Sequence, residues 1–496
     1  MMVWLCGAVL SFAVILGGGT HAGFIGDVFV QILSIPLLMM ALWRLLEPAR
    51  RDFQKIRVIF IPILAAIVLV GIQVLPLPFD VWAGGASFFP NDSESPLILP
   101  SRNWATLSIS PQATWAAAAS LIVPAAIFSA AGQLEFKDRL ILTWLMLFLG
   151  GAALVLGFLQ VAQGPASGLR FYEVTNPSEA VGFFANRNHF AAHLYVALVL
   201  GSLWFLGETH KFMKTRALYG RSTLLVTAAG VFLVSVMAGL AMARSRAGDF
   251  LAIAALGGII LLVFTQRGKE EGHSRGRRFS GGRMSILTIL FAAVFAAQFG
   301  LGSILSRFQG DPAEDLRVPL AKTTTEAAFK ALPFGTGLGS FVPVYATVEK
   351  EKDAFPGYAN RAHNDFVEFF LEAGVIGVLL MLGFAAWFFY RCYKFWLRAA
   401  FKNSDPLLLH QRAATLIILL LLLHSAVDYP LRTCAMSAIF AFFCAILALD
   451  ARAPQEAPAK PVRKPQKNNA PSQGIPVIER WGPDKQWPEG WQRTSG

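Results

Sequence analysis

The chain has 496 residues, of which 55% are hydrophobic and only 15% are charged. A soluble domain carries about 25% charged residues, so this composition excludes a soluble globular protein and indicates a polytopic membrane protein. The net charge of +12 does not point to nucleic acid, because the basic residues cluster in short loops between apolar runs, as membrane topology requires.

Twelve apolar segments approach the length of about 20 residues that a membrane-spanning helix needs. They cover residues 3–19, 24–46, 58–76, 113–130, 139–162, 189–206, 223–243, 248–265, 285–303, 366–390, 411–427 and 433–449. We therefore predict an all-α membrane protein with about twelve transmembrane helices. The first segment lacks a charged leader, which favours a retained span over a cleaved signal peptide.

The basic residues between these segments fall on one side of the membrane if the N-terminus starts there. They are Arg50, Arg51, Lys55, Arg57, Lys137, Arg139, Lys211, Lys214, Arg216, Arg221, Arg267, Lys269, Arg275, Arg277, Arg278, Arg283, Arg391, Lys394, Arg398 and Lys402. The positive-inside bias makes that side cytoplasmic. The sequence thus predicts that both termini are cytoplasmic.

The opposite, outer side receives the remaining loops. These are residues 77–112, 163–188, 244–247, 304–365 and 428–432. The longest, 304–365, contains helical patches and a glycine-rich turn at 333–340, which we interpret as a flexible closure over the membrane surface. We assign residues 1–450, including this loop, to one transmembrane domain, and residues 451–496, rich in Pro and Lys, to a disordered cytoplasmic tail.

The stretch from Arg361 to Gly377 runs from a polar loop into an apolar helix. At 100° per residue, one face carries His363, Val367, Phe370, Gly374 and Gly377. Glycines on that face would let a second helix approach closely. An imidazole at the start of this helix face could take a proton from a bound hydroxyl near neutral pH. The alternative is a histidine that only ends a helix at the membrane interface.

Four arginines lie on the outer side, contrary to the positive-inside bias: Arg187, Arg244, Arg246 and Arg432. A guanidinium stays charged and pairs with phosphate in a fixed fork geometry. A lipid-linked pyrophosphate is the natural anion at that depth. The alternative is that each arginine pairs with Asp249, Asp428 or a lipid headgroup.

Other reactive side chains give weaker patterns. His189 and His193 are one helical turn apart, but no third metal ligand is evident, and the cysteines lack metal-ligand spacing. We therefore predict no metal site. Glu368 and Glu372 are also one turn apart. They are either structural partners of an arginine, or Glu372 is the base in place of His363.

Four segments resemble the O-antigen ligase and O-antigen polymerase (Wzy_C-type) superfamily across residues 110–450. The signature is His363-Asn364, then nine intervening residues, then Gly374-x-x-Gly377. Similar segments begin at Asn186, Arg244 and His424. The resemblance implies a GT-C-like fold and a metal-independent, inverting glycosyltransferase without a cofactor. It would take a glycan from undecaprenyl pyrophosphate at the periplasmic face of a bacterial inner membrane.

The resemblance also implies roles for single residues. His363 would activate the acceptor hydroxyl, the pyrophosphate would be held by Arg187, Arg244 and Arg246, and Asp428 and Arg432 would shape the site. The remaining substrate-binding residues would be Asn186, Asn188 and Asn364. The acceptor would be a lipid A–core sugar for a ligase or another repeat unit for a polymerase, with membrane lipids around the protein.

A twelve-span transporter of sugars or lipid-linked sugars is the main alternative. Transporters place functional polar groups near the membrane midplane, often in repeated halves. Here the polar motifs fall at one face and no repeat is visible, which favours an enzyme.

Overall fold

The computed structural model describes residues 1–20, 24–47, 52–78, 104–215, 221–266, 317–350, 359–398 and 406–448. All of them lie in one compact unit, Met1–Ala453. The tail 451–496, the predicted span 285–303 and most of the basic loop before it lie outside the described residues.

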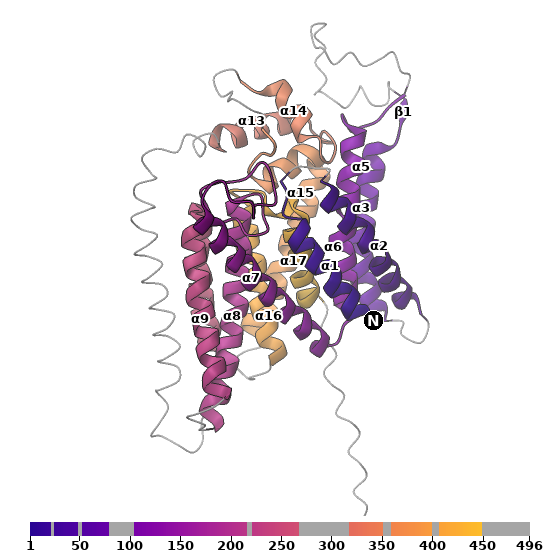
Figure 1. The fold of residues 1–496 in the computed structure, drawn as a ribbon. Helices are drawn as coiled ribbons and strands as arrows, with labels where there is room; N and C mark the ends of the chain where they lie inside the picture. Colours follow the sequence, from indigo (N-terminus) through magenta and orange to yellow (C-terminus); the bar gives the residue numbers. More distant parts are fainter. Residues whose placement is uncertain are drawn as a thin grey trace, which may run out of the picture. The chain divides into compact units, whose positions relative to one another are not determined.

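Helices dominate the described part of the chain (Figure 1). The apolar helices of the bundle and their continuations are α1 (Met2–Leu16), α2 (Ile25–Leu46), α3 (Phe53–Val74), α5 (Pro111–Ser120), α6 (Ile122–Gln133), α7 (Phe136–Gln163), α8 (Arg187–Thr215), α9 (Arg221–Ala243), α10 (Arg246–Gln266), α15 (Asp365–Cys392), η3 (Tyr393–Arg398), α16 (Pro406–Ser425) and α17 (Cys434–Ala448). The short elements are β1 (Leu77–Pro78), β2 (Trp104–Ala105), α13 (Arg317–Lys330), α14 (Phe341–Val348) and η4 (Pro430–Arg432).

Nine helical segments of the described chain are long and apolar enough to cross a membrane, and α1 and α17 are shorter apolar helices. This confirms an all-α polytopic membrane protein, apart from one antiparallel pair between β1 and β2. The total of twelve spans stays a prediction, because the ninth predicted span is not among the residues described.

The helix α8 lies in the interior of the bundle. Its side chains from Phe190 to Leu200 are all buried, and it packs against α7, α9, α10 and α16. Small residues permit this: a Cβ on Gly150 would lie 2.8 Å from Ala197, and one on Gly248 would lie 2.5 Å from Ala191. A helix that is apolar all round is buried by its neighbours. Outer helices such as α2 and α3 instead expose large apolar side chains, as contact with lipid requires.

The helices α13 and α14 lie across the end of the bundle at which α15 begins (Figure 1). There Asn364 caps α15, because its Oδ1 accepts bonds from the backbone N–H groups of Phe366 and Val367. His363 therefore lies outside the helix, with φ of +50°. The prediction that it continues a helical face is wrong, because the 100° count holds only where the backbone is helical.

The helix α15 is interrupted at Gly374, whose φ is +55°. The glycine-rich turn 333–340 fills the interruption: the Thr336 N–H donates to Leu371 O at 2.9 Å, and the Val375 N–H donates to Pro333 O at 2.9 Å. Gly374 thus admits a loop backbone rather than the second helix that the sequence predicted. The turn is bonded into the helix and is not a free closure.

We expect Gly374→Ala to lower the free energy of unfolding by about 1–3 kcal/mol, because a side chain is strained at positive φ and overpacks its neighbours. An added Cβ would lie 2.3 Å from Pro333 O. The matched control is Gly383→Ala in the same helix, where a Cβ meets nothing within 4 Å. Thermal unfolding in detergent measures both, and equal midpoints would contradict the account of the interruption.

Candidate functional site

Asp428 lies just beyond α16 and is fully buried. Its Oδ1 is 3.1 Å from His363 Nδ1, its Oδ2 accepts a hydrogen bond from Asn188 Nδ2, and Arg317 Nη2 lies 4.0 Å away. Burial alone would raise the pKa of Asp428, but the hydrogen bond to His363 and the nearby positive charges hold that pKa well below its usual range. The buried group is therefore a carboxylate.

This carboxylate fixes the tautomer of His363. An ionised carboxylate only accepts hydrogen bonds, so His363 Nδ1 carries the hydrogen and donates it to Asp428. In the neutral ring the lone pair then lies on Nε2. The His363 side chain is 24% exposed, so a base of this kind is open to a substrate hydroxyl.

Tyr429 forms a wall of the same site. Its ring packs edge to face against His363 and His189, with centroids 4.9 Å apart in both pairs. Its hydroxyl accepts a bond from Asn360 Nδ2 at 3.3 Å. Burial raises the pKa of the phenol to about 12, so Tyr429 stays neutral and limits the rotation of the His363 ring.

The turn between α9 and α10 carries two of the predicted arginines. Arg244 is exposed with φ of +52°, and Arg246 begins α10. Between them, Ser245 Oγ donates to Asn188 Oδ1 at 2.8 Å and accepts the Gly248 N–H at 3.0 Å. This buried serine ties the arginine turn to the start of α8.

Arg187, the first residue of α8, has a protein partner. Its Nη1 lies 3.0 Å from Glu179 Oε1, and its backbone N–H donates to Asn176 Oδ1 at 2.9 Å. Glu179 was not among the carboxylates that the sequence suggested as partners. The pairing neutralises part of the positive charge that Arg187 would offer to a pyrophosphate.

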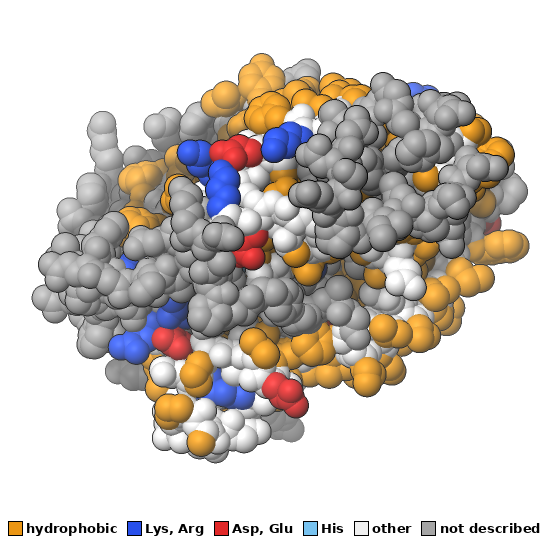
Figure 2. Space-filling view, turned by 90° about the horizontal axis from the view of Figure 1, so that it is seen from above, with side chains coloured by type: hydrophobic (Ala, Val, Ile, Leu, Met, Phe, Trp, Pro, Cys, Tyr) orange, Lys and Arg blue, Asp and Glu red, His pale blue; other side chains and the backbone are white. Residues whose placement is uncertain are grey.

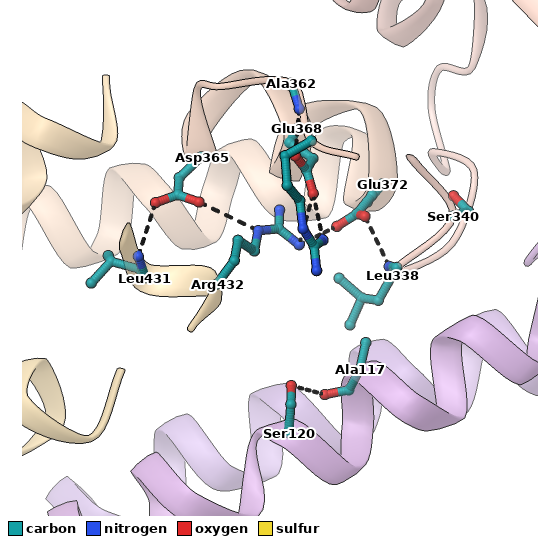
Figure 3. A network of polar contacts seen from close by, with 12 residues as sticks. Ala117, Ser120, Leu338, Ser340, Ala362, Asp365, Glu368, Glu372, Leu431 and Arg432 are labelled. Atoms are coloured by element: carbon teal, nitrogen blue, oxygen red, sulfur yellow. Dashed lines mark hydrogen bonds and ion pairs between the residues drawn. The ribbon is translucent and has the colours of Figure 1, made fainter. Parts of the chain in front are cut away.

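Arg432 is surrounded by carboxylates of α15 (Figure 3). It lies 2.8 Å from Glu372, 3.5 Å from Glu368 and 3.4 Å from Asp365. Burial would lower the pKa of Arg432, but these carboxylates raise it above its ordinary value. Arg361 pairs with Glu368 at 2.9 Å, so the two guanidinium groups and the three acidic side chains form one cluster. The contacts of Arg432 tie the turn after α16 to the first turns of α15.

The same contacts decide between the two interpretations of Glu372. Its Oε2 accepts from Arg432, and its Oε1 accepts from the Gly339 N–H at 2.9 Å. With side-chain exposure of 0%, this carboxylate is a structural partner of an arginine and fastens the glycine-rich turn. The geometry favours His363 as the base.

The three predicted asparagines have protein partners at their side-chain amides. Asn186 Oδ1 accepts the Asn188 N–H at 2.8 Å, Asn188 bridges Asp428 and Ser245, and Asn364 caps α15 while its Nδ2 donates to Ala426 O at 2.8 Å. Their contacts hold the backbone around the site; Asn188 is buried, whereas Asn186 and Asn364 are partly exposed.

Two further features concern possible metal ligands and charge. Among the described residues, no group of three His, Cys, Asp or Glu side chains is placed to hold a metal ion, and His189 and His193 are buried along α8. Viewed from the end that carries α13 and α14, basic side chains lie beside acidic ones (Figure 2).

Three site residues escaped prediction. Ser245 and Tyr429 lie inside the motifs that we quoted, but neither carries a charge or a nucleophile that stands out. Arg317 precedes a predicted helical patch, and its Nη1 donates to Val427 O at 3.3 Å. Its proximity to Asp428 depends on how the long loop folds.

Residues 228–382 match the model of the O-antigen ligase family. The resemblance to this family is confirmed. No curated protein matches the chain. The match supports a ligase- or polymerase-type role in O-antigen biosynthesis, with a lipid-linked glycan as donor and a glycan as acceptor. It includes Arg244, Arg246 and His363, whereas Asn188 and Asp428 lie outside it.

We expect Arg432→Met to lower the free energy of unfolding by about 3–5 kcal/mol, because it leaves buried carboxylates without their counter-charge. The control is Lys137→Met, whose side chain is 75% exposed and 3.0 Å from Glu135; it should leave the unfolding midpoint unchanged. Thermal unfolding in detergent compares the two. A stable Arg432→Met protein would show that the carboxylate cluster does not need this arginine.

Proposed function

We propose that the protein is a metal-independent, inverting glycosyltransferase of the periplasmic face, with a GT-C-like helical fold. It transfers a glycan from undecaprenyl pyrophosphate to a sugar hydroxyl. The observation that carries the proposal is the hydrogen bond between Nδ1 of the partly exposed His363 and the buried Asp428, because it leaves the imidazole lone pair on Nε2. The distribution of Lys and Arg supports cytoplasmic termini and a periplasmic site.

In the proposed reaction, His363 Nε2 takes the proton of the acceptor hydroxyl as its oxygen attacks the anomeric carbon. The bond from that carbon to the pyrophosphate oxygen breaks, and its electron pair leaves with the pyrophosphate. A single displacement from the opposite side inverts the configuration. Asp428 keeps the ring in the required tautomer and stabilises the imidazolium that forms.

Arg244 and Arg246 are the proposed ligands of the leaving pyrophosphate, with a smaller contribution from Arg187 because Glu179 pairs with it. A pyrophosphate already leaves readily, so guanidinium charge can replace a metal in stabilising it. The transporter alternative has no observation in its favour.

The acceptor distinguishes a ligase from a polymerase. Purified protein in vesicles is given a donor of known glycan length together with either a lipid A–core acceptor or a second lipid-linked repeat unit. Addition to lipid A–core identifies a ligase, and stepwise lengthening of the lipid-linked glycan identifies a polymerase.

His363→Ala should abolish transfer while the protein remains folded, because a positioned general base contributes about 10²–10⁴-fold to the rate. The measurement is glycan transfer by purified protein from a lipid-linked donor. Lys350→Ala is the control, since Lys350 pairs with Glu326 on the exposed face of the same outer loop. Undiminished turnover by the His363 variant would reject the base assignment.

Arg246→Ala should raise the donor KM about tenfold, equivalent to about 1.4 kcal/mol of binding. Arg246→Lys should recover only part of the loss, because lysine keeps the charge but lacks the planar fork. If the arginines replace a metal, the wild-type rate also survives a chelator. A wild-type KM in Arg246→Ala would exclude this arginine as a donor ligand, and strict dependence on an added cation would reject the metal-free reaction.

A further inference from the structure

A continuous chain of hydrogen bonds links the arginine turn to the proposed base. It runs from the Gly248 N–H to Ser245 Oγ at 3.0 Å, from Ser245 Oγ to Asn188 Oδ1 at 2.8 Å, from Asn188 Nδ2 to Asp428 Oδ2, and from Asp428 Oδ1 to His363 Nδ1 at 3.1 Å. Ser245, Asn188 and Asp428 are 1%, 6% and 0% exposed, so water does not compete for these bonds.

The two ends of this chain have the same unusual backbone. Among the described residues, Arg244 and His363 are the two non-glycine residues with positive φ, +52° and +50°. Such conformations cost free energy and persist only where surrounding contacts enforce them. Arg244 adjoins Ser245, and His363 is the last member of the chain, so the network lies between the two strained positions.

The chemistry of the chain requires an asparagine at its centre. Asp428 only accepts hydrogen bonds, so it needs the amide N–H₂ of Asn188. The other end of that amide accepts the hydroxyl hydrogen of Ser245. An aspartate would place a second carboxylate against Asp428, and a leucine would leave one oxygen of the buried carboxylate without this donor.

We propose that Asn188 and Ser245 are positioning residues that hold the pyrophosphate-binding turn and the base in one fixed relation. The inference rests on the proposed function, since it takes His363 as the base and Arg244 and Arg246 as donor ligands. This chain of hydrogen bonds would hold the leaving group and the attacking hydroxyl in place at the anomeric carbon at the same time. Neither Asn188 nor Ser245 contacts the substrate.

A change in the position of the arginine turn relative to His363 should affect the chemical step more than donor binding. In Ser245→Ala the arginines remain but Asn188 loses one of its two anchors, so kcat should fall about tenfold while the donor KM changes less than about threefold. Ser245→Thr keeps the hydroxyl and should recover most of kcat. Both variants keep every charge of the site.

A charge exchange tests the centre of the chain. Asn188→Asp alone puts two carboxylates together and should lower kcat about a hundredfold. Adding Asp428→Asn restores an amide beside a carboxylate, because the amide introduced at position 428 can accept from His363 and donate to the carboxylate at position 188. The double variant should regain at least about tenfold in kcat over Asn188→Asp.

The double variant also moves the negative charge one residue away from His363. A more distant anion stabilises the imidazolium less, so the acid limb of the pH profile of kcat should move to lower pH than in the wild type. A purely structural role for Asn188 predicts no such displacement. The control is Ser202→Ala on the same helix, because Ser202 is buried, bonds only to Leu198 O at 2.8 Å among the described contacts, and lies outside the chain.

The outcomes separate this inference from the function on which it rests. Turnover that survives His363→Ala would reject the proposed base itself. An inactive His363→Ala with wild-type kcat in Ser245→Ala, or equal losses of kcat in Ser245→Ala and Ser245→Thr, would overturn the positioning role alone. A double variant no better than Asn188→Asp, with its acid limb in the wild-type place, would overturn it as well.

Discussion

The buried carboxylate of Asp428 is the contact on which the site depends. A charge in a water-excluded interior is tolerated only when hydrogen bonds and opposite charge compensate for lost hydration. Here the compensation comes from His363, Asn188 and the Tyr429 backbone N–H. His363 and Asn188 belong to parts of the chain far from Asp428, so the cost of burying one anion favours their convergence.

A second cluster fixes the start of α15 in the same way. Arg432 and Arg361 compensate Asp365, Glu368 and Glu372, and the interruption at Gly374 lets the turn 333–340 reach Glu372. The two clusters differ in how many acidic contacts their basic side chain makes. Arg432 contacts three acidic side chains, whereas Asp428 contacts only one nitrogen of His363. Proximity to the site therefore does not by itself make an arginine a substrate ligand.

Hydrophobic segments predicted the helices well because apolar length is a local property. The convergence of the outer motifs was also predictable, since topology places them at one membrane face, and the structure brings Asn188, Ser245, His363 and Asp428 together. The partners within that face were not predictable. Asp428 meets a histidine 65 positions away and lies 4.0 Å from Arg317 in the long outer loop, and no spacing along the chain encodes either contact.

The interruption of α15 shows the other limit of sequence reasoning. A glycine in an apolar run indicates equally a close helix contact or a residue at positive φ. Only the docking of the turn at Pro333 decides between them, and that docking depends on Glu372 and the backbone of residues 371–375. The prediction for His363 failed for a related reason, since the Asn364 cap makes Asp365 the first helical residue, two positions after His363.

Helix direction bears on the proposed binding of a pyrophosphate. The helices α8, α10 and α15 begin at Arg187, Arg246 and Asp365, and the bonds through Asn188, Ser245 and Asp428 join these beginnings. A helix N-terminus carries a partial positive charge. Acidic residues in the first turns of α10 and α15 offset that charge, whereas the first turn of α8 has none. In the proposed reaction, the start of α8 would thus add to the guanidinium groups as negative charge develops on the departing pyrophosphate, because fixed dipoles need no reorganisation when the bond breaks.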